Sequence, residues 1–194
     1  MVNDTRLSLS TLIIHVYIAR PARGAKHLLT TTRTTHDRST RGNFGLDATR
    51  RGLVIARDSG NRYNEALLTS SLSHLEAEHG DPLAALDYVT LAIRTYHDAG
   101  HTTGVHTTLA ILAVFLDRLG RHESAATFAG FVRRPFPAGF RGFDAAIAHL
   151  RNVLGEATYV SLARKGDTMT TAEMVAYAYA QIDEARAQLK TVAK

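Results

Sequence analysis

Apolar residues recur at alternating spacings of three and four through most of the chain after residue 45. This is the periodicity of amphipathic helices, which bury one face and expose the other. No segment after residue 45 alternates in the manner of a strand, so the pattern predicts an all-α protein. Two of the stripes consist of Leu86, Val89, Ile93 and Tyr96, and of Val105, Leu109, Leu112, Leu116 and Leu119.

Glycines follow one another at twenty-residue intervals, at positions 60, 80, 100 and 120. This spacing leaves room for about sixteen helical residues and a short turn, with glycine as the left-handed residue that ends each helix. Asp81 before Pro82 suits a helix start, and the alanine pairs 84–85 and 125–126 allow close packing. The chain is therefore predicted to form antiparallel helix pairs in a tetratricopeptide-like repeat array.

The twenty-residue spacing of the glycine turns does not continue after Val132. Residues 131–143 contain two prolines and two glycines and are predicted to form a loop. A helix is expected over 143–154, and a short one is expected to end before Gly166. In the last predicted helix, Thr170 and Glu173 have the spacing of a capping box, and this helix is expected to close the C-terminal end of the array.

The charge divides the chain at the same place as the periodicity. Residues 1–45 hold seven Lys or Arg and two Asp or Glu, whereas residues 46–194 hold sixteen of each sign. The whole net charge of +5 therefore belongs to the first part. Residues 30–40 contain six threonines and no apolar residue, and the apolar run 7–19 is too short to span a bilayer. We expect a poorly ordered basic tail over 1–45 and a repeat domain over 46–194.

The tail has two interpretations. In the first it is an arm that contacts nucleic acid or anionic lipid. In the second, which we favour, it is foreign to the domain and derives from an upstream frame or junction, because its composition changes abruptly near Leu46. The basic residues that would make the contacts are Arg20, Arg23, Lys26, Arg33, Arg38 and Arg41.

Motifs for catalysis or metal binding do not stand out along the sequence. Cysteine is absent, which excludes thiol catalysis and cysteine-based metal sites, and neither a Gly-x-Ser-x-Gly elbow nor a phosphate-binding GxxxxGK[ST] loop occurs. His97 and His101 are four residues apart but are separated by Gly100, and the pairs 74/79 and 101/106 are five residues apart, so no two histidines have the i,i+4 spacing on one continuous helix face, ideally with a carboxylate, that a helical zinc site uses. We interpret them as solvated or capping side chains and predict no enzyme, no cofactor and no metal.

Phenylalanine and arginine are interleaved over residues 128–143, a pattern that can clamp a partner. The alternative, which we favour, is that the phenylalanines seal a junction between two sets of helices, because Phe128 and Phe131 continue a helix face. If the segment is functional, protein contact is favoured over nucleic acid. The candidate contacts are Arg133, Arg134, Phe136, Phe140 and Arg141.

Residues 80–100 (GDPLAALDYVTLAIRTYHDAG) and 109–131 resemble the C-terminal helical region of large bacterial signalling ATPases. Some members of that family carry an adenylate cyclase domain or end in a LuxR-type helix-turn-helix. The segment 146–178, with its LxxxLGE turn, is similar to the closing part of the same region. None of the family's catalytic or DNA-reading motifs occurs here, so the resemblance implies only the helical platform, a regulatory part of such proteins, and suggests a truncated or rearranged relative.

These observations predict a cytoplasmic, non-catalytic interaction or sensor module. Its expected partner is a protein or peptide, and a signalling ATPase is one candidate. A small inducer on the concave face is another possible ligand, and no contact with membranes is expected. The start of the array near Leu46 looks uncapped, which predicts self-association or marginal stability. The alternative function is a nucleic-acid-binding regulator that uses the basic arm.

Overall fold

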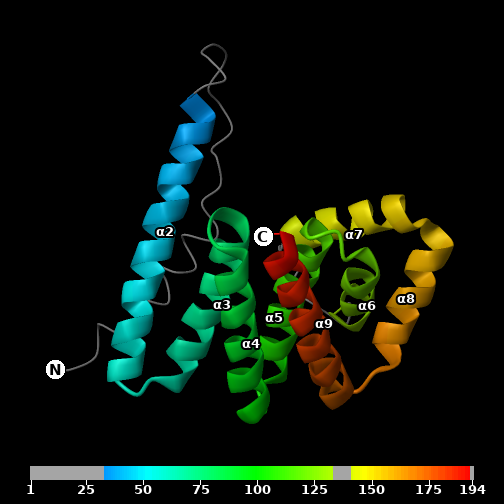
Figure 1. The fold of residues 1–194 in the computed structure, drawn as a ribbon. Helices are drawn as coiled ribbons and strands as arrows, with labels where there is room; N and C mark the ends of the chain where they lie inside the picture. Colours follow the sequence, from blue (N-terminus) through cyan, green and yellow to red (C-terminus); the bar gives the residue numbers. More distant parts are fainter. Residues whose placement is uncertain (1–32, 133–140, 193–194) are drawn as a thin grey trace, which may run out of the picture. The chain divides into compact units, whose positions relative to one another are not determined.

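The computed structural model describes residues 33–132 and 141–192. Within them the chain is helical and contains no strand, which confirms the all-α prediction (Figure 1). None of the described helices is both long and apolar enough to cross a membrane. The helices are α2 (Arg33–Asp58), α3 (Arg62–His79), α4 (Pro82–Asp98), α5 (Thr102–Arg118), α6 (His122–Val132), α7 (Arg141–Leu154), α8 (Glu156–Thr168) and α9 (Thr171–Val192).

Backbone contacts divide the chain into Met1–Thr34 and Thr35–Lys194, and the second unit holds all of α3–α9. Helix α2 runs through residue 45, where the composition of the sequence changes, so no helix end coincides with that change. Gly52 of α2 faces Leu68 of α3, since a Cβ on this glycine would lie 3.5 Å from that side chain. Helix α2 therefore packs on α3 within the second unit.

Three of the predicted glycine turns have one shared geometry. Gly60, Gly100 and Gly120 adopt φ values of 64°, 65° and 75°, which glycine reaches without a steric penalty. In each turn the N–H of the next residue donates to the carbonyl five positions back. These bonds join Asn61 to Ala56, His101 to Tyr96 and Arg121 to Leu116, at 2.8–2.9 Å.

The prediction of a left-handed residue at Gly80 is wrong, because its φ is −126°. Glycine leaves room here for the Glu76 carboxylate in its present position, since a Cβ would lie 2.0 Å from Oε2 of Glu76. That oxygen accepts the N–H of Asp81 at 3.1 Å, and the buried Glu76 carboxylate pairs with Arg50 of α2. The hydrogen bond to Glu76 and the charge of its carboxylate raise the pKa of Arg50. The α3–α4 turn is therefore built around a carboxylate rather than a left-handed glycine.

Side chains cap the helix starts as the sequence indicates. Asp81 Oδ1 accepts the N–H of Leu83 at 2.8 Å, with Pro82 in the first turn of α4. Thr170 and Glu173 form the predicted capping box, in which Glu173 Oε2 accepts the Thr170 N–H at 2.8 Å. These two contacts fix the helix boundaries at the start of α4 and α9.

Among the described residues, the core cluster is formed by α4, α5 and α6 together with α7, α8 and α9, whereas α3 contributes only Ala66 to its buried members. The apolar stripe of α4 is buried, as is that of α5 up to Leu116. Phe128 and Phe131 of α6 and Phe143 of α7 are also buried. These three phenylalanines therefore belong to the core, in agreement with the packing interpretation.

Helices α6 and α8 approach one another more closely than any side chain would allow. A Cβ on Gly130 would lie 1.9 Å from the carbonyl oxygen of Ala163, and one on Gly166 would lie 1.9 Å from that of Thr127. The prediction that a helix ends before Gly166 is wrong, because α8 continues to Thr168. This glycine serves the helix crossing and does not end the helix.

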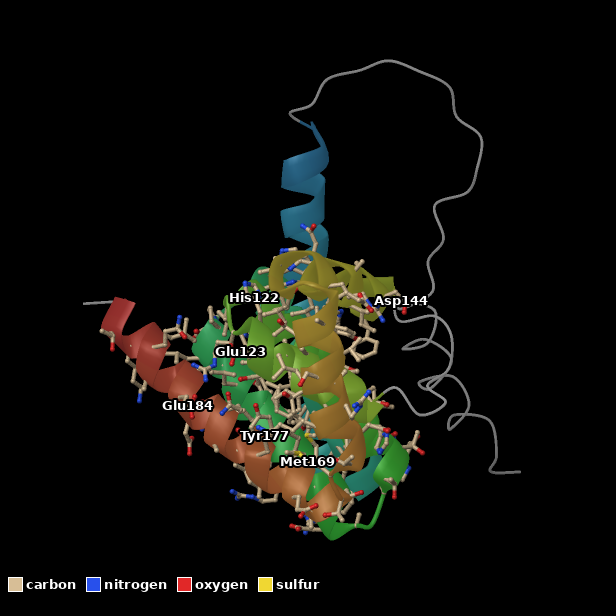
Figure 2. All side chains as sticks on the ribbon, turned by 90° about the vertical axis from the view of Figure 1, so that its right-hand side faces the viewer. His122, Glu123, Asp144, Met169, Tyr177 and Glu184 are labelled. Atoms are coloured by element: carbon tan, nitrogen blue, oxygen red, sulfur yellow. The ribbon has the colours of Figure 1, made fainter. Side chains whose placement is uncertain are left out.

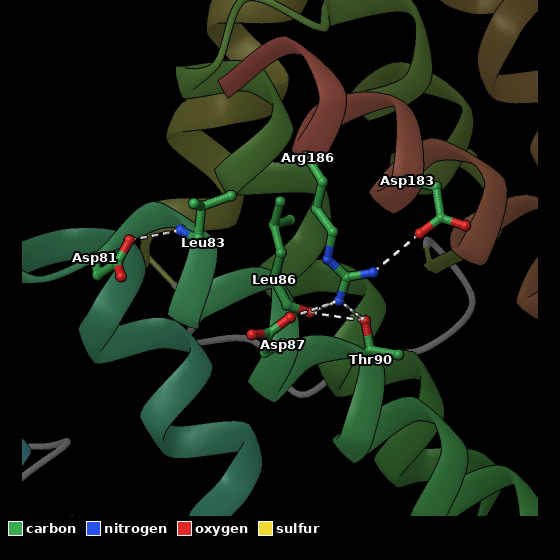
Figure 3. Close-up of polar contacts among 7 residues, drawn as sticks. All are labelled: Asp81, Leu83, Leu86, Asp87, Thr90, Asp183 and Arg186. Carbon is green, nitrogen blue, oxygen red and sulfur yellow. Dashed lines mark hydrogen bonds and ion pairs between the residues drawn. The ribbon is translucent and has the colours of Figure 1, made fainter. Parts of the chain in front are cut away.

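Helix α9 returns across the array and contacts α4, α5 and α6. Arg186 joins it to α4, because its Nη2 donates to Asp87 Oδ1 at 2.8 Å and to Thr90 Oγ1 at 3.0 Å (Figure 3). Its Nη1 donates to Asp183 within α9 at 3.0 Å. The last helix therefore lies across α4, α5 and α6.

Candidate functional site

A polar cluster lies where the chain turns from α5 into α6. Asp117 belongs to the last turn of α5, and its side chain is 9% exposed. The left-handed Gly120 donates its N–H to the Asp117 carbonyl at 3.0 Å and reverses the chain. This turn brings His122, the first residue of α6, back to the carboxylate, with its Nδ1 3.0 Å from Asp117 Oδ1.

The third member of the cluster, His149, comes from α7. Its Nδ1 lies 2.9 Å from Oδ1 and 3.0 Å from Oδ2 of Asp117. The rings of His122 and His149 meet edge to face, with centroids 5.5 Å apart. One carboxylate therefore accepts hydrogen bonds from two imidazoles on two different helices, and it holds α7 against the α5–α6 turn.

A shallow cavity of about 450 Å³, wide open to solvent, adjoins this cluster and shares His122 with it. It combines charged, hydroxyl, amide and apolar groups from the α5–α6 turn, α7 and α9. Figure 2 shows His122 and Glu123 at the start of α6, beside α9 with Glu184. The lining residues are Gly120, Arg121, His122, Glu123, Ser124, Leu154 and Gln188.

Arg121 ties the wall of this cavity to α9. Its Nη2 donates to Gln181 Oε1 at 2.9 Å and contacts the carboxylate of Glu184. Ser124 donates to the same Gln181 oxygen, and the Gln181 amide donates to Glu184 Oε1 at 3.2 Å. The Nε of Arg121 is buried and has no hydrogen-bond partner among the described residues. The wall is thus a fixed polar network that holds Arg121 and Ser124 in place.

A second candidate surface lies on α2. Leu46, Leu53 and Ala56 are buried, whereas Val54 and Ile55 are 56% and 62% exposed. Tyr63, at the start of α3, is 61% exposed. Charged residues accompany these side chains, because Asp47 and Arg51, two turns and one turn before Val54, form an exposed ion pair. Contiguous exposed apolar patches are typical of surfaces that contact another protein, and Val54 and Ile55 are two consecutive exposed residues of this kind.

The site residues predicted from the sequence mostly lie outside the described residues. This holds for Arg133, Arg134, Phe136 and Phe140, while Arg141 is the first residue of α7 and its side chain is not described. Of the basic residues in the predicted arm, Arg33, Arg38 and Arg41 fall in α2. The other three, Arg20, Arg23 and Lys26, also lie outside the described residues.

The other described histidines take structural positions. His101 caps α5, with its Nδ1 accepting the Gly104 N–H at 3.0 Å, which confirms the capping interpretation for this residue. Burial lowers the pKa of His74, which lies 3.5 Å from Glu78. His97 is partly exposed, 3.9 Å from the carboxylate of Asp98. The cluster at Asp117 was not predicted from the sequence. The spacing of Asp117 and His122 on either side of the Gly120 turn could have indicated it.

No family model matches the chain, and neither does any of the curated proteins or solved structures. The resemblance to the helical region of signalling ATPases therefore stays a prediction, and the functional argument depends on the side chains described above.

Proposed function

We propose that this chain is a non-catalytic interaction module of the helical-repeat type, related to the regulatory region of transcriptional-regulator ATPases. It acts by binding another protein through the outer face of α2. The observation that carries this proposal is the exposure of Val54 and Ile55, neighbouring aliphatic residues that are each more than half exposed. Water is displaced favourably from such side chains when a partner covers them.

The position of this face within the array supports the proposal. Repeat arrays bury apolar surface by stacking one unit on the next, and their outermost helices are usually polar on the outside. Helix α2 is the first helix of the described array, and its outer face carries Val54 and Ile55 between charged residues. Another helical-repeat unit would continue the stack at this face.

A second copy of this chain is the partner to test first, because it supplies a repeat array of the same kind. A signalling ATPase with a helical-repeat region would dock in the same manner. Substitution of both aliphatic residues by aspartate would place two charges in the interface, where an unpaired charge is costly to bury. Because both side chains are exposed in the single chain, the double variant should change its stability by no more than about 0.5 kcal/mol per site.

Sedimentation velocity over a concentration series tests this proposal. The wild-type chain should shift toward dimer as its concentration rises, whereas V54D/I55D should remain a monomer. Val153 of α7 is 47% exposed and supplies the matched control, V153D, which should associate like the wild type. A wild-type chain that stays monomeric at all concentrations would contradict the binding of a second copy at this face. A double variant that unfolds would contradict it too, since it would show that the face is covered within one chain.

A further inference from the structure

We propose that Asp117, His122 and His149 form a binding site for Zn²⁺. One ligand atom from each of the three side chains lies within 4.8 Å of the other two. Two imidazoles and one carboxylate are a ligand set that zinc uses where it keeps a further position open. This inference is independent of the proposed function, because it concerns the α5–α6 turn and α7 rather than the face of α2.

The distances between the three groups suit such an ion. Zinc binds nitrogen and carboxylate oxygen at about 2.0–2.2 Å, so two adjacent ligand atoms around it lie roughly 2.9–3.5 Å apart. Both histidine Nδ1 atoms are 2.9–3.0 Å from Asp117 Oδ1. Two of the three ligand separations therefore already match a zinc site, and the ligand atoms of the two histidines, which lie within 4.8 Å of one another, would close on the ion by rotation of the imidazole rings.

The backbone prepares two of the three ligands before any ion arrives. Asp117 and His122 flank the Gly120 turn, which is closed by two backbone hydrogen bonds of 3.0 and 2.9 Å. Their relative position is thus fixed by local structure, and little conformational entropy remains to be lost on binding. His149 completes the site from the middle of α7, and its side chain is 51% exposed, so its ring has room to adjust.

The site has both a buried and an open side. The carboxylate of Asp117 is almost fully buried, which reduces competition from water for the ion. His149 faces solvent and His122 borders the cavity of about 450 Å³, so an ion can enter and keep a position for water or an outside ligand. Bound zinc would join α5, α6 and α7, and would hold α7 to the turn more firmly than hydrogen bonds alone.

Calorimetric titration of the full chain with zinc chloride, after treatment with a chelator, tests this proposal. We expect one Zn²⁺ per chain, and we expect H149A and H122A each to weaken this binding at least tenfold. H97A is the matched control, because His97 is a partly exposed histidine beside a carboxylate in α4, and it should bind zinc like the wild type. H149A leaves the bond between His122 and Asp117 intact, so circular dichroism should show it folded.

Two further measurements distinguish this site from chance binding by other histidines. Zinc should raise the melting temperature of the wild type and of H97A but not that of H149A, because only a site formed by the folded chain stabilises it. Cobalt in place of zinc should give the visible absorption bands of a tetrahedral site, and H149A should lose them. Absence of stoichiometric binding, or equal binding by the wild type, H122A and H149A, would overturn the proposal and leave a hydrogen-bonded cluster.

Discussion

The close crossing of α6 and α8 predicts a large effect from two very small substitutions, Gly130→Ala and Gly166→Ala. Each added methyl would lie 1.9 Å from a backbone carbonyl oxygen, whereas Cβ contacts shorter than 3.0 Å essentially never occur. Since a backbone carbonyl cannot rotate away as a side chain can, the two helices must separate by about 1 Å.

The cost of that separation follows from the packing around the crossing. Overpacking of a well-filled core costs about 1–3 kcal/mol, and the upper end applies because the obstacle is backbone. Alanine returns up to about 1 kcal/mol through its higher helix propensity. We therefore expect each variant to lose about 2 kcal/mol of unfolding free energy, or roughly 4–8 °C in melting temperature for a chain of this size.

Gly52 of α2 supplies the control. A methyl there would meet Leu68 at 3.5 Å, an ordinary contact, so G52A should gain up to about 1 kcal/mol from helix propensity alone. Thermal and urea denaturation, followed by circular dichroism, measure all three variants. The double variant G130A/G166A should lose less than the sum of the single losses, because the helices need to separate only once. G130A or G166A with wild-type stability would refute this description of the crossing.

Three further predictions concern single contacts. Hydrogen bonds from Thr170 lower the pKa of Glu173, so this carboxylate stabilises the fold above its ordinary pKa of 4.5 and loses that effect as the pH falls. The difference in melting temperature between the wild type and E173A should therefore be present at pH 7 and shrink at pH 3. Burial raises the pKa of Tyr96 to about 12, so the protonated phenol stabilises the fold below pH 10, and this contribution is lost between pH 10 and 12. In urea titrations Y96F should therefore lose less stability at alkaline pH than the wild type. R186A should lose about 1 kcal/mol of unfolding free energy in urea denaturation, because it removes hydrogen bonds between α9 and α4. R51A removes an exposed ion pair and should lose less than about 0.5 kcal/mol.

Local signals in the sequence predicted most of the fold. The stripes of α4 and α5, the turns at Gly60, Gly100 and Gly120, and the capping box before α9 each depend on residues close together in the chain. The prediction of a helix end was wrong where a glycine is required by packing between helices. Gly166 looks like the end of a helix in one dimension, yet it is required by the approach of the Thr127 carbonyl from another helix.

In the candidate sites, too, contacts between residues close in the sequence could be predicted, whereas contacts between distant residues could not. The contact of Asp117 with His122 is local, and the spacing across the Gly120 turn allows it to be expected. His149 joins them from 32 residues after Asp117, and only the packing of α7 on α5 brings it there. The exposure of Val54 and Ile55 on α2 could not be predicted either, because helical periodicity does not show how much of each helix face a neighbouring helix covers.

The central claim, that the outer face of α2 binds a second copy of the chain, is tested most directly by a spin label on that face. The chain has no cysteine, so I55C and V153C each provide one attachment point. The electron paramagnetic resonance spectrum of the label at residue 55 should change from mobile to immobilised as protein concentration rises, while the label at residue 153 should remain mobile. A spectrum at residue 55 that does not depend on concentration would contradict the claim.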